Sequence, residues 1–246
     1  LRVFAPADSG EMTLVCNFVR PQPPPEELRT EQALLRFVSL VPFLDDAALG
    51  AKLDVWNTSR SFLELCAGDS EEHALLLCNY LLTLSKYDKE AYVVLGTGIP
   101  EGQTAYVLTK GMAAREHRLW NASSGRVYAL TDLSLPLHSV ACVFNGDNVW
   151  ANVQPTDKPA SLEWSFGDSA QWRPFFGKGG YPPTTLQSVQ DAHLRYRRTS
   201  EDHRKDVERE VEDTLQRAIE DRRGHRPTDW NRSVAAKLRP LLRRFE

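Results

Sequence analysis

The sequence predicts an α+β fold, with helices packed on one face of an antiparallel sheet and a helical extension at the C-terminal end. Three observations lead to this prediction. Up to about residue 84, apolar residues recur at helical spacing, whereas between residues 90 and 154 they alternate in short segments separated by Gly, Asn and Ser. From about residue 186 the composition becomes strongly charged. Helices followed by adjacent short strands favour a layered α+β arrangement.

The chain is expected to divide into four segments. Residues 1–20 are predicted to be a strand-like junction to a preceding domain. Residues 21–27 hold four prolines, which is typical of a stiff, extended linker. Residues 28–185 are the predicted domain, and residues 186–246 are the predicted helical extension.

Three helices are expected first within the domain. Apolar residues from Leu28 to Val38 recur at helical spacing, and Pro42 ends the pattern. A second helix is expected around residues 59–67 and a third from Ser70 to Leu84. The strands are expected in the segments EAYVVLGTG, QTAYVLTK, EHRLWNASSGRVYAL, SVACVF and NVWANVQ. The tryptophans at 120, 150, 164 and 172 are expected to fill the core between sheet and helices.

The C-terminal extension should form two amphipathic helices. Between residues 201 and 223 almost every residue is charged, apart from one apolar stripe. Gly224 and Pro227 should separate this helix from a second one, which Pro240 should bend or end. The two stripes consist of Val207, Val211, Leu215, Ala218 and Ile219, and of Trp230, Val234, Leu238, Leu241 and Leu242.

Composition narrows the classes of function. The chain has 246 residues, 41% of them hydrophobic, and a net charge of −3, which predicts no bulk attraction to nucleic acid or to a membrane. Its arginine-rich stretches are mixed with acidic residues, so we expect solvated helical faces there rather than a nucleic-acid surface. Its longest apolar run is too short to cross a bilayer, so no direct membrane insertion is expected. The four widely spaced cysteines indicate reduced, packed thiols in a cytoplasmic protein, and neither a metal nor a cofactor is expected.

The segment GDSEEHALLLCNYLL, residues 68–82, carries the strongest local signal. Asp69 suits the N-cap of a helix, and Glu72 three residues later completes a capping box. Ser70 then occupies the first helical position, where the helix dipole would lower the pKa of a thiol. A hydroxyl gains little from that field and would need a base within hydrogen-bond reach.

Three motifs in order, GDSEEHALLL, GIPEGQTAYVLT and LWNASSGRVY, resemble the transglutaminase-like branch of the papain-like fold. The resemblance implies a Cys at the start of the helix, a His in the following strand and an Asp in the strand after it. Ser70, Thr104 and Asn121 stand at these three positions. A hydroxyl, a hydroxyl and an amide cannot form a thiolate or shuttle a proton near neutral pH, which favours a pseudoenzyme.

The same motifs, together with FVSLVPFL and WNRS, resemble a family of ciliary transition-zone scaffold proteins that have coiled-coil and C2 domains. This resemblance implies a non-catalytic module that takes part in protein–protein assembly and cilium biogenesis. It implies a location in the cytoplasm at the cilium base, in the transition zone or basal body. The implied partners are other transition-zone proteins, namely B9-domain and membrane components.

The alternative is an active hydrolase or transferase that uses Ser70 or Cys78 with a nearby imidazole. His73 lies one helical turn after Ser70, and His117 shares a strand with Asn121. A half-buried, backbone-bonded His73 and inert, packed cysteines are the simpler interpretation. A third alternative is that this region only completes the fold of its neighbours and binds nothing.

A vestigial peptide cleft would leave the fold with a binding function. By analogy, an extended peptide such as a tubulin tail is a candidate occupant. The acidic residues near the cleft disfavour an acidic tail, so a basic or neutral ligand fits better. The residues expected around this cleft are Asp69, Ser70, Glu71, His73, Glu101, Thr104 and Asn121.

Overall fold

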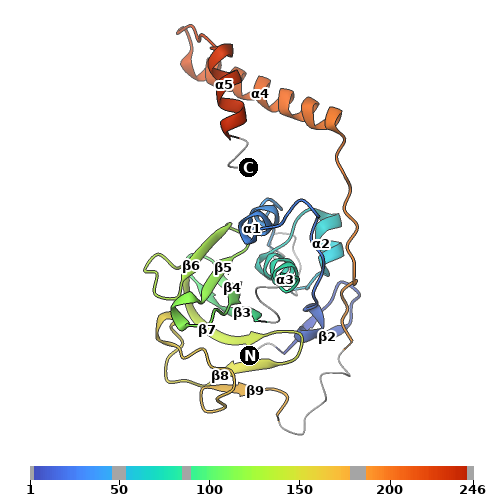
Figure 1. Cartoon of the computed structure of the whole chain (residues 1–246), viewed down its shortest axis with the longest axis vertical. Helices are drawn as coiled ribbons and strands as arrows, with labels where there is room; N and C mark the ends of the chain where they lie inside the picture. Colours follow the sequence, from blue (N-terminus) through green and yellow to red (C-terminus); the bar gives the residue numbers. More distant parts are fainter. Residues whose placement is uncertain (1–2, 46–53, 85–89, 178–186, 243–246) are drawn as a thin grey trace. The chain divides into compact units, whose positions relative to one another are not determined.

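The computed structural model describes residues 3–45, 54–84, 90–177 and 187–242. Within these ranges the chain forms two compact units, one up to Arg195 and one from Tyr196 onwards (Figure 1). In the first unit the helices are α1 (Glu31–Ser39), α2 (Ser59–Leu65) and α3 (Ser70–Leu81), with 3₁₀ turns η1 (Val15–Phe18), η3 (Ala114–Glu116) and η4 (Pro159–Ser161). Its strands are β1 (Phe4–Pro6), β2 (Met12–Leu14), β3 (Ala91–Gly98), β4 (Gly102–Thr109), β5 (Arg118–Asn121), β6 (Arg126–Ala129), β7 (Leu137–Phe144), β8 (Val149–Asn152) and β9 (Trp172–Pro174).

The predicted α+β architecture is confirmed. Strands β3 to β9 form an antiparallel sheet in the order β6-β5-β4-β3-β7-β8-β9, while β1 and β2 pair separately. Helix α3 packs on β3 and β4, and α1 and α2 pack in turn on α3. The three helices lie on one side of the sheet (Figure 1). Helix α1 begins at Glu31 rather than at Leu28, because the Thr30 hydroxyl caps it by accepting from the Ala33 amide.

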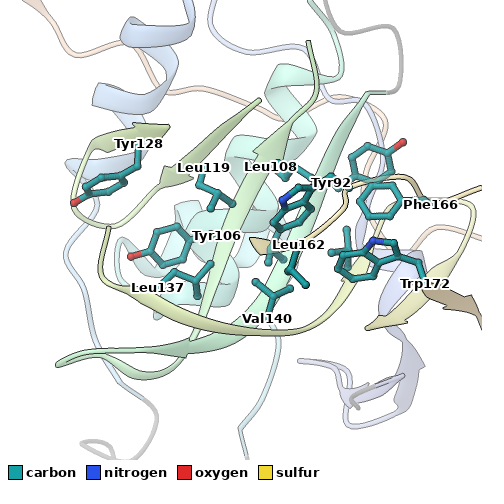
Figure 2. Packing of buried hydrophobic residues seen from close by; sticks show 13 residues of the cluster. Tyr92, Tyr106, Leu108, Leu119, Tyr128, Leu137, Val140, Leu162, Phe166 and Trp172 are labelled. Carbon is teal, nitrogen blue, oxygen red and sulfur yellow. The ribbon is translucent and has the colours of Figure 1, made fainter. Parts of the chain in front are cut away.

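The two faces of the sheet bury different clusters. Phe144 stacks on Trp56 on the helix side, and its sheet partner is Val93. Val94 therefore points to the opposite face, because side chains alternate along a strand. There it joins a cluster rich in aromatic residues (Figure 2). The cluster consists of Tyr92, Val94, Tyr106, Leu108, Leu119, Tyr128, Leu137, Val140, Val143, Leu162, Trp164, Phe166 and Trp172.

This second cluster corrects the expected place of three tryptophans. Trp150, Trp164 and Trp172 do not lie between sheet and helices but on the far face of the sheet, where the rings of Trp164 and Trp172 are 5.6 Å apart and Trp150 stacks on Phe166. The indole N–H of Trp172 donates to the Glu163 carbonyl oxygen, and that of Trp164 donates to the Pro159 carbonyl oxygen. Because a buried indole needs a hydrogen-bond partner, these bonds fasten the segment from residue 159 to β9 over the face that the helices leave uncovered.

The expected junction and the proline-rich stretch both lie within the first unit. Asn79 of α3 joins them to the domain: its side-chain oxygen accepts from the Arg20 amide, and its NH₂ donates to the Phe18 carbonyl oxygen and to Gln22 Oε1. Gln22, in the middle of the prolines, is fully buried and also donates to the Asp191 carbonyl oxygen. Gln22 thus fixes the first part of the proline-rich stretch to the domain.

The segment after residue 186 also belongs to the first unit, up to Arg195. Gln190 is buried; its side-chain oxygen accepts from the Ser59 amide and its NH₂ donates to the Phe18 carbonyl oxygen. These bonds explain why the second unit begins at Tyr196 and not at residue 186, where the change in composition places it.

The second unit contains the two predicted helices, α4 (Glu201–Arg223) and α5 (Arg232–Leu242). Arg239 Nη2 lies 2.6 Å from Glu212 Oε2, and the Trp230 indole donates to Glu220 Oε1, so these contacts hold α5 against α4. Pro240 lies inside α5, which continues to Leu242 instead of ending there. The apolar stripe of α4 remains 41–57% exposed at Val207, Val211, Leu215 and Ile219. None of the helices that the structure describes is long and apolar enough to span a membrane.

The position of Asn79 yields a stability prediction. Replacing Asn79 by Ala should lower the free energy of unfolding by about 2–4 kcal/mol, because it leaves the Arg20 amide and Gln22 Oε1 without this partner, each costing roughly 1–3 kcal/mol, whereas the Phe18 carbonyl keeps Gln190. Urea denaturation at neutral pH measures the change. Gln32→Ala, which removes an exposed amide from α1, is the matched control and should change stability by less than about 0.5 kcal/mol. Equal effects of the two substitutions would contradict the role given to Asn79.

Candidate functional site

The first turn of α3 forms the predicted capping box. The Asp69 carboxylate accepts from the Glu71 amide at 3.0 Å, and Glu72 Oε2 accepts from the Asp69 amide at 2.9 Å. Glu72 Oε1 also accepts from the Asn57 amide at 2.9 Å. The carboxylates thus satisfy the free N–H groups at the start of a helix that is buried on nearly all sides.

Ser70, at the first helical position, is 7% exposed and held by two hydrogen bonds. Its hydroxyl donates to Glu71 Oε2 at 2.8 Å and accepts from the Ala105 amide at 3.0 Å. That amide is available because β5 pairs with β4 only at residues 107–109, so the preceding part of β4 has no strand on this side. Ser70 therefore takes the place of a strand partner for the β4 edge.

Neither imidazole considered as a base reaches Ser70. The two ring nitrogens of His73 face the carbonyl oxygens of Asp69 and Val41, the second at 2.9 Å. His117 lies just before Arg118, which pairs with Thr109 at the far end of β4 from Ala105. Burial and the nearby Lys110 ammonium lower the pKa of His117. All six histidines fall within the described ranges, and none of them hydrogen-bonds to Ser70 or Cys78.

Cys78 is fully buried in the middle of α3, and burial raises the pKa of its thiol. Burial likewise raises the pKa of Cys16 to about 12. Because the thiolate is the nucleophilic form, these two cysteines are packed thiols without reactivity at neutral pH.

Asn121 belongs to a different hydrogen-bonded group. Its NH₂ donates to Glu101 Oε1 at 2.7 Å and to the Tyr106 hydroxyl at 2.8 Å, while its side-chain oxygen accepts from the Ser124 amide. Burial and the Glu101 carboxylate raise the pKa of Tyr106. In the described part of the chain, no hydrogen bond joins Asn121 to Ser70 or to Thr104.

A cavity of about 580 Å³ opens beside the first turn of α3. Its volume lies in the range of small-molecule sites, roughly 300–1,000 Å³. Part of its wall comes from a bulge in β7: Leu95 pairs with Cys142 and Gly96 with Val140, which leaves Ala141 without a partner. The lining comprises Glu71 of α3, Gln103 and Thr104 of β4, residues 95–97 of β3, Ala141 and Cys142 of β7, and Val3 and Phe4 near the start of the chain.

Gly96 is required for this arrangement of β3 and β7. A Cβ atom on Gly96 would lie 2.0 Å from the Ser139 carbonyl oxygen, which belongs to the backbone and cannot move aside. The close approach of the two strands at the bulge therefore depends on glycine.

The carboxylates around the cavity repel one another. Burial, together with the nearby Asp69 and then Asp54, raises the pKa of Glu71 well above its ordinary value. Burial and Asp69 raise the pKa of Glu72 as well, although the N–H groups that donate to its two oxygens oppose the rise. In the described residues, no Lys or Arg forms an ion pair with Asp69, Glu71 or Glu72.

The structure distributes the residues expected around the cleft over three places. Glu71 and Thr104 line the cavity, and Ser70 and Asp69 lie behind Glu71 in the same helical turn. His73 is turned towards Val41. Glu101 and Asn121 form the separate group around Tyr106. Sequence reasoning missed the Ala105 amide, Tyr106, Gln103 and the bulge at Ala141; only Tyr106 carried a signal, because it shares a strand face with Thr104.

Comparison with known proteins shows which proteins this chain is similar to. Residues 54–175 match the family model of the CEP76 peptidase-like domain. The chain is 34% identical to human Protein CC2D2B over 97% of its own length, and 28% identical to Drosophila melanogaster coiled-coil and C2 domain-containing protein 2A over 85%. The chain carries a transglutaminase-like domain of the CC2D2 type. Mouse centrosomal protein of 76 kDa is 29% identical over 71% of the chain.

The resemblance predicted from the three motifs is thereby confirmed. The matches cover 17% of CC2D2B, 15% of the Drosophila protein and 28% of the mouse protein, so this CC2D2-type chain spans less than a third of the relatives it matches.

Two neighbouring glutamates of this CC2D2-type domain should respond oppositely to the same substitution. A carboxylic acid whose pKa is higher in the folded state destabilises the fold as pH rises from its unfolded pKa, near 4.5, through its folded pKa. Glu71→Gln removes this destabilisation, and the amide oxygen of the new side chain can still accept from the Ser70 hydroxyl. We therefore expect the substitution to raise the free energy of unfolding at pH 7 by about 0.5–2 kcal/mol. The gain should shrink towards pH 4.

Glu72→Gln is the matched control. Both oxygens of Glu72 accept N–H bonds, and an amide would turn its own N–H₂ towards one of these donors, so stability should fall by about 1.5–3 kcal/mol. Urea denaturation from pH 4 to pH 8 measures both variants. A gain for both, or a Glu71→Gln gain that does not change with pH, would contradict this account.

Proposed function

We propose that this chain is a non-catalytic transglutaminase-like module of a scaffold protein at the cilium base, acting in protein–protein assembly and cilium biogenesis. The proposal rests on the hydrogen bonds of the Ser70 hydroxyl and on its position outside the cavity lining. Its hydroxyl is occupied by Glu71 and by the Ala105 amide, and it is not among the residues that line the cavity. A serine attacks only when a base takes its proton and the substrate carbonyl can reach its oxygen.

The location in this proposal is supported by the names of the relatives, and the partners follow from the resemblance of the motifs. Several matched relatives are named centrosomal protein of 76 kDa, and one is named coiled-coil and C2 domain-containing protein 2A. B9-domain and membrane components of the transition zone are the partners that we propose. The exposed apolar stripe of α4 and the cavity beside α3 are the surfaces through which this chain would contribute to assembly.

One competing function has a specific contact in its favour. The Ser70 hydroxyl donates to Glu71, and burial raises the pKa of that carboxyl, which makes its carboxylate a stronger base. A hydrolase with a Ser70–Glu71 pair would replace the histidine-based enzyme considered from the sequence. The buried position of Ser70 against the β4 edge weighs against it.

A reactivity assay separates the two functions. We expect a fluorophosphonate probe to label the chain no faster than it labels Ser70→Ala, because no base and substrate approach meet at Ser70. Ser70→Cys should likewise gain no peptidase or transamidase activity. Mass spectrometry locates any adduct. Labelling at Ser70 that Glu71→Gln abolishes would establish the hydrolase and overturn the non-catalytic proposal.

A localisation assay tests the assembly role. In ciliated cells that lack the endogenous protein, the full-length protein with Ser70→Ala should restore cilia to within about 20% of wild type. The pair Val211→Asp and Leu215→Asp should reduce accumulation at the cilium base several-fold, because a buried, unpaired carboxylate excludes a partner from the stripe. The exposed Glu208→Gln, on the same helix, is the control and should behave as wild type.

Loss of cilia with Ser70→Ala would show that chemistry at Ser70 is needed. Normal accumulation of the double stripe variant would show that α4 does not hold the partner.

A further inference from the structure

The second unit has no core of its own. From Tyr196 to Leu241 no described side chain is buried, and the large apolar side chains of both helices are 37–57% exposed. Most of the stability of a helix comes from packing its apolar face, and a unit of this size has little other surface to bury. The apolar stripe of α4 therefore requires a partner that covers it.

The stripe of α4 has the same spacing when it is read in either direction. Val207, Val211, Leu215 and Ile219 follow one another at intervals of four residues, with residue 213 at their centre. If two α4 helices packed antiparallel about this centre, Val207 of one copy would face Ile219 of the other, and Val211 would face Leu215. A surface that is complementary to itself is what a dimer with two-fold symmetry requires.

The charges on one flank of the stripe are complementary in the same arrangement. Glu210 and Arg217 are seven residues apart and so lie about 20° apart around the helix axis. In the antiparallel pair, Glu210 of each copy would lie opposite Arg217 of the other. Neither side chain forms an ion pair within the described residues, where the Arg217 guanidinium donates to the Asp213 carbonyl oxygen. Both charges thus remain available to a second copy.

The charges elsewhere along the stripe are compatible with this pairing. Glu212 lies on the opposite side of α4 from that flank and bonds to Arg239 of α5, so its charge is compensated within its own copy. Arg204 and Arg222 would meet at the two ends of the helix pair. Both would stay in water there, and Arg204 is paired with Glu201 at 2.6 Å, so their repulsion is small.

We propose that α4 of this chain pairs with α4 of a second copy in an antiparallel dimer with two-fold symmetry. The inference rests on the proposed function, because it names the partner of the stripe through which the scaffold assembles. A different protein would have to supply both an apolar stripe and matching charges, whereas a second copy carries both. The dimer would present every other binding surface twice, which strengthens attachment to further components through multivalency.

Sedimentation equilibrium of the purified chain measures the association. We expect a monomer–dimer equilibrium with a Kd on the order of 10 µM, since one helix pair buries less surface than a standard interface. Glu210→Arg and Arg217→Glu should each weaken the dimer about ten-fold, because each substitution brings two pairs of like charges together. An equimolar mixture of these two variants should associate to within about three-fold of wild type, since every facing pair then has opposite charges.

Two further variants test the surface itself. Asp213→Arg makes the same change in charge as Glu210→Arg, but on the exposed face of α4 opposite the stripe, so this matched control should leave the Kd unchanged. Val211→Asp combined with Leu215→Asp should give a monomer, because pairing would bury unpaired carboxylates. Circular dichroism checks that each variant keeps its helices.

A chain that stays monomeric at about twenty times the expected Kd would overturn the proposal and leave the stripe to the first unit or to another protein. A mixture of the two charge variants that associates no better than either alone would overturn it as well. The assembly role is tested separately. If the chain is monomeric and the double stripe variant still loses its accumulation at the cilium base, the dimer alone is refuted, whereas labelling of Ser70 would refute the non-catalytic role whatever the association state.

Discussion

The burial of helix α3 is the constraint on which the rest of the first unit depends. Eleven of its twelve residues are buried, so its polar groups cannot use water and must find partners in the protein. Asn79 therefore draws the segment from Phe18 to Gln22 onto the domain, and His73 bonds to the carbonyl oxygen of Val41. The capping box satisfies the N-terminal amides of the helix. The packing of both ends of the first unit follows from these few bonds.

The same constraint fixes the geometry of the candidate site. The N-terminus of α3 meets the part of β4 that β5 leaves unpaired, and the Ser70 hydroxyl serves both elements. The Ser70 side chain therefore has a structural role, because moving it would leave the Ala105 amide without this partner. Glu71 lies next to it but faces the cavity, where burial and neighbouring acids work against its charge. Ser70 thus satisfies the unpaired edge of β4, whereas Glu71 forms part of the cavity wall.

Local patterns predicted the elements well, and tertiary bonds explain where prediction failed. The cap at Asp69 and Glu72, the strand segments and the charged helix α4 all follow from spacing and residue type. The burial of Gln22 on the domain could not be foreseen, because it depends on a hydrogen bond to Asn79, 57 residues away. Likewise the bulge at Ala141 changes which β7 residues face the cavity, and the segment SVACVF contains no residue pattern that predicts it. The positions of Ser70, Thr104 and Asn121 came from resemblance, whereas their partners came only from the fold.

The separation of these three positions has a physical explanation in the hydrogen-bonding capacity of the residues that stand there. The side-chain amide of Asn121 offers both donors and an acceptor. Glu101, Tyr106 and Ser124 satisfy it locally, so it forms no hydrogen bond with Thr104 in the described part of the chain. A hydroxyl at 70 can serve the Ala105 amide and Glu71 at once. Thr104, at 5% exposed, is as buried as the other two and lies on the face of β4 that it shares with Tyr106.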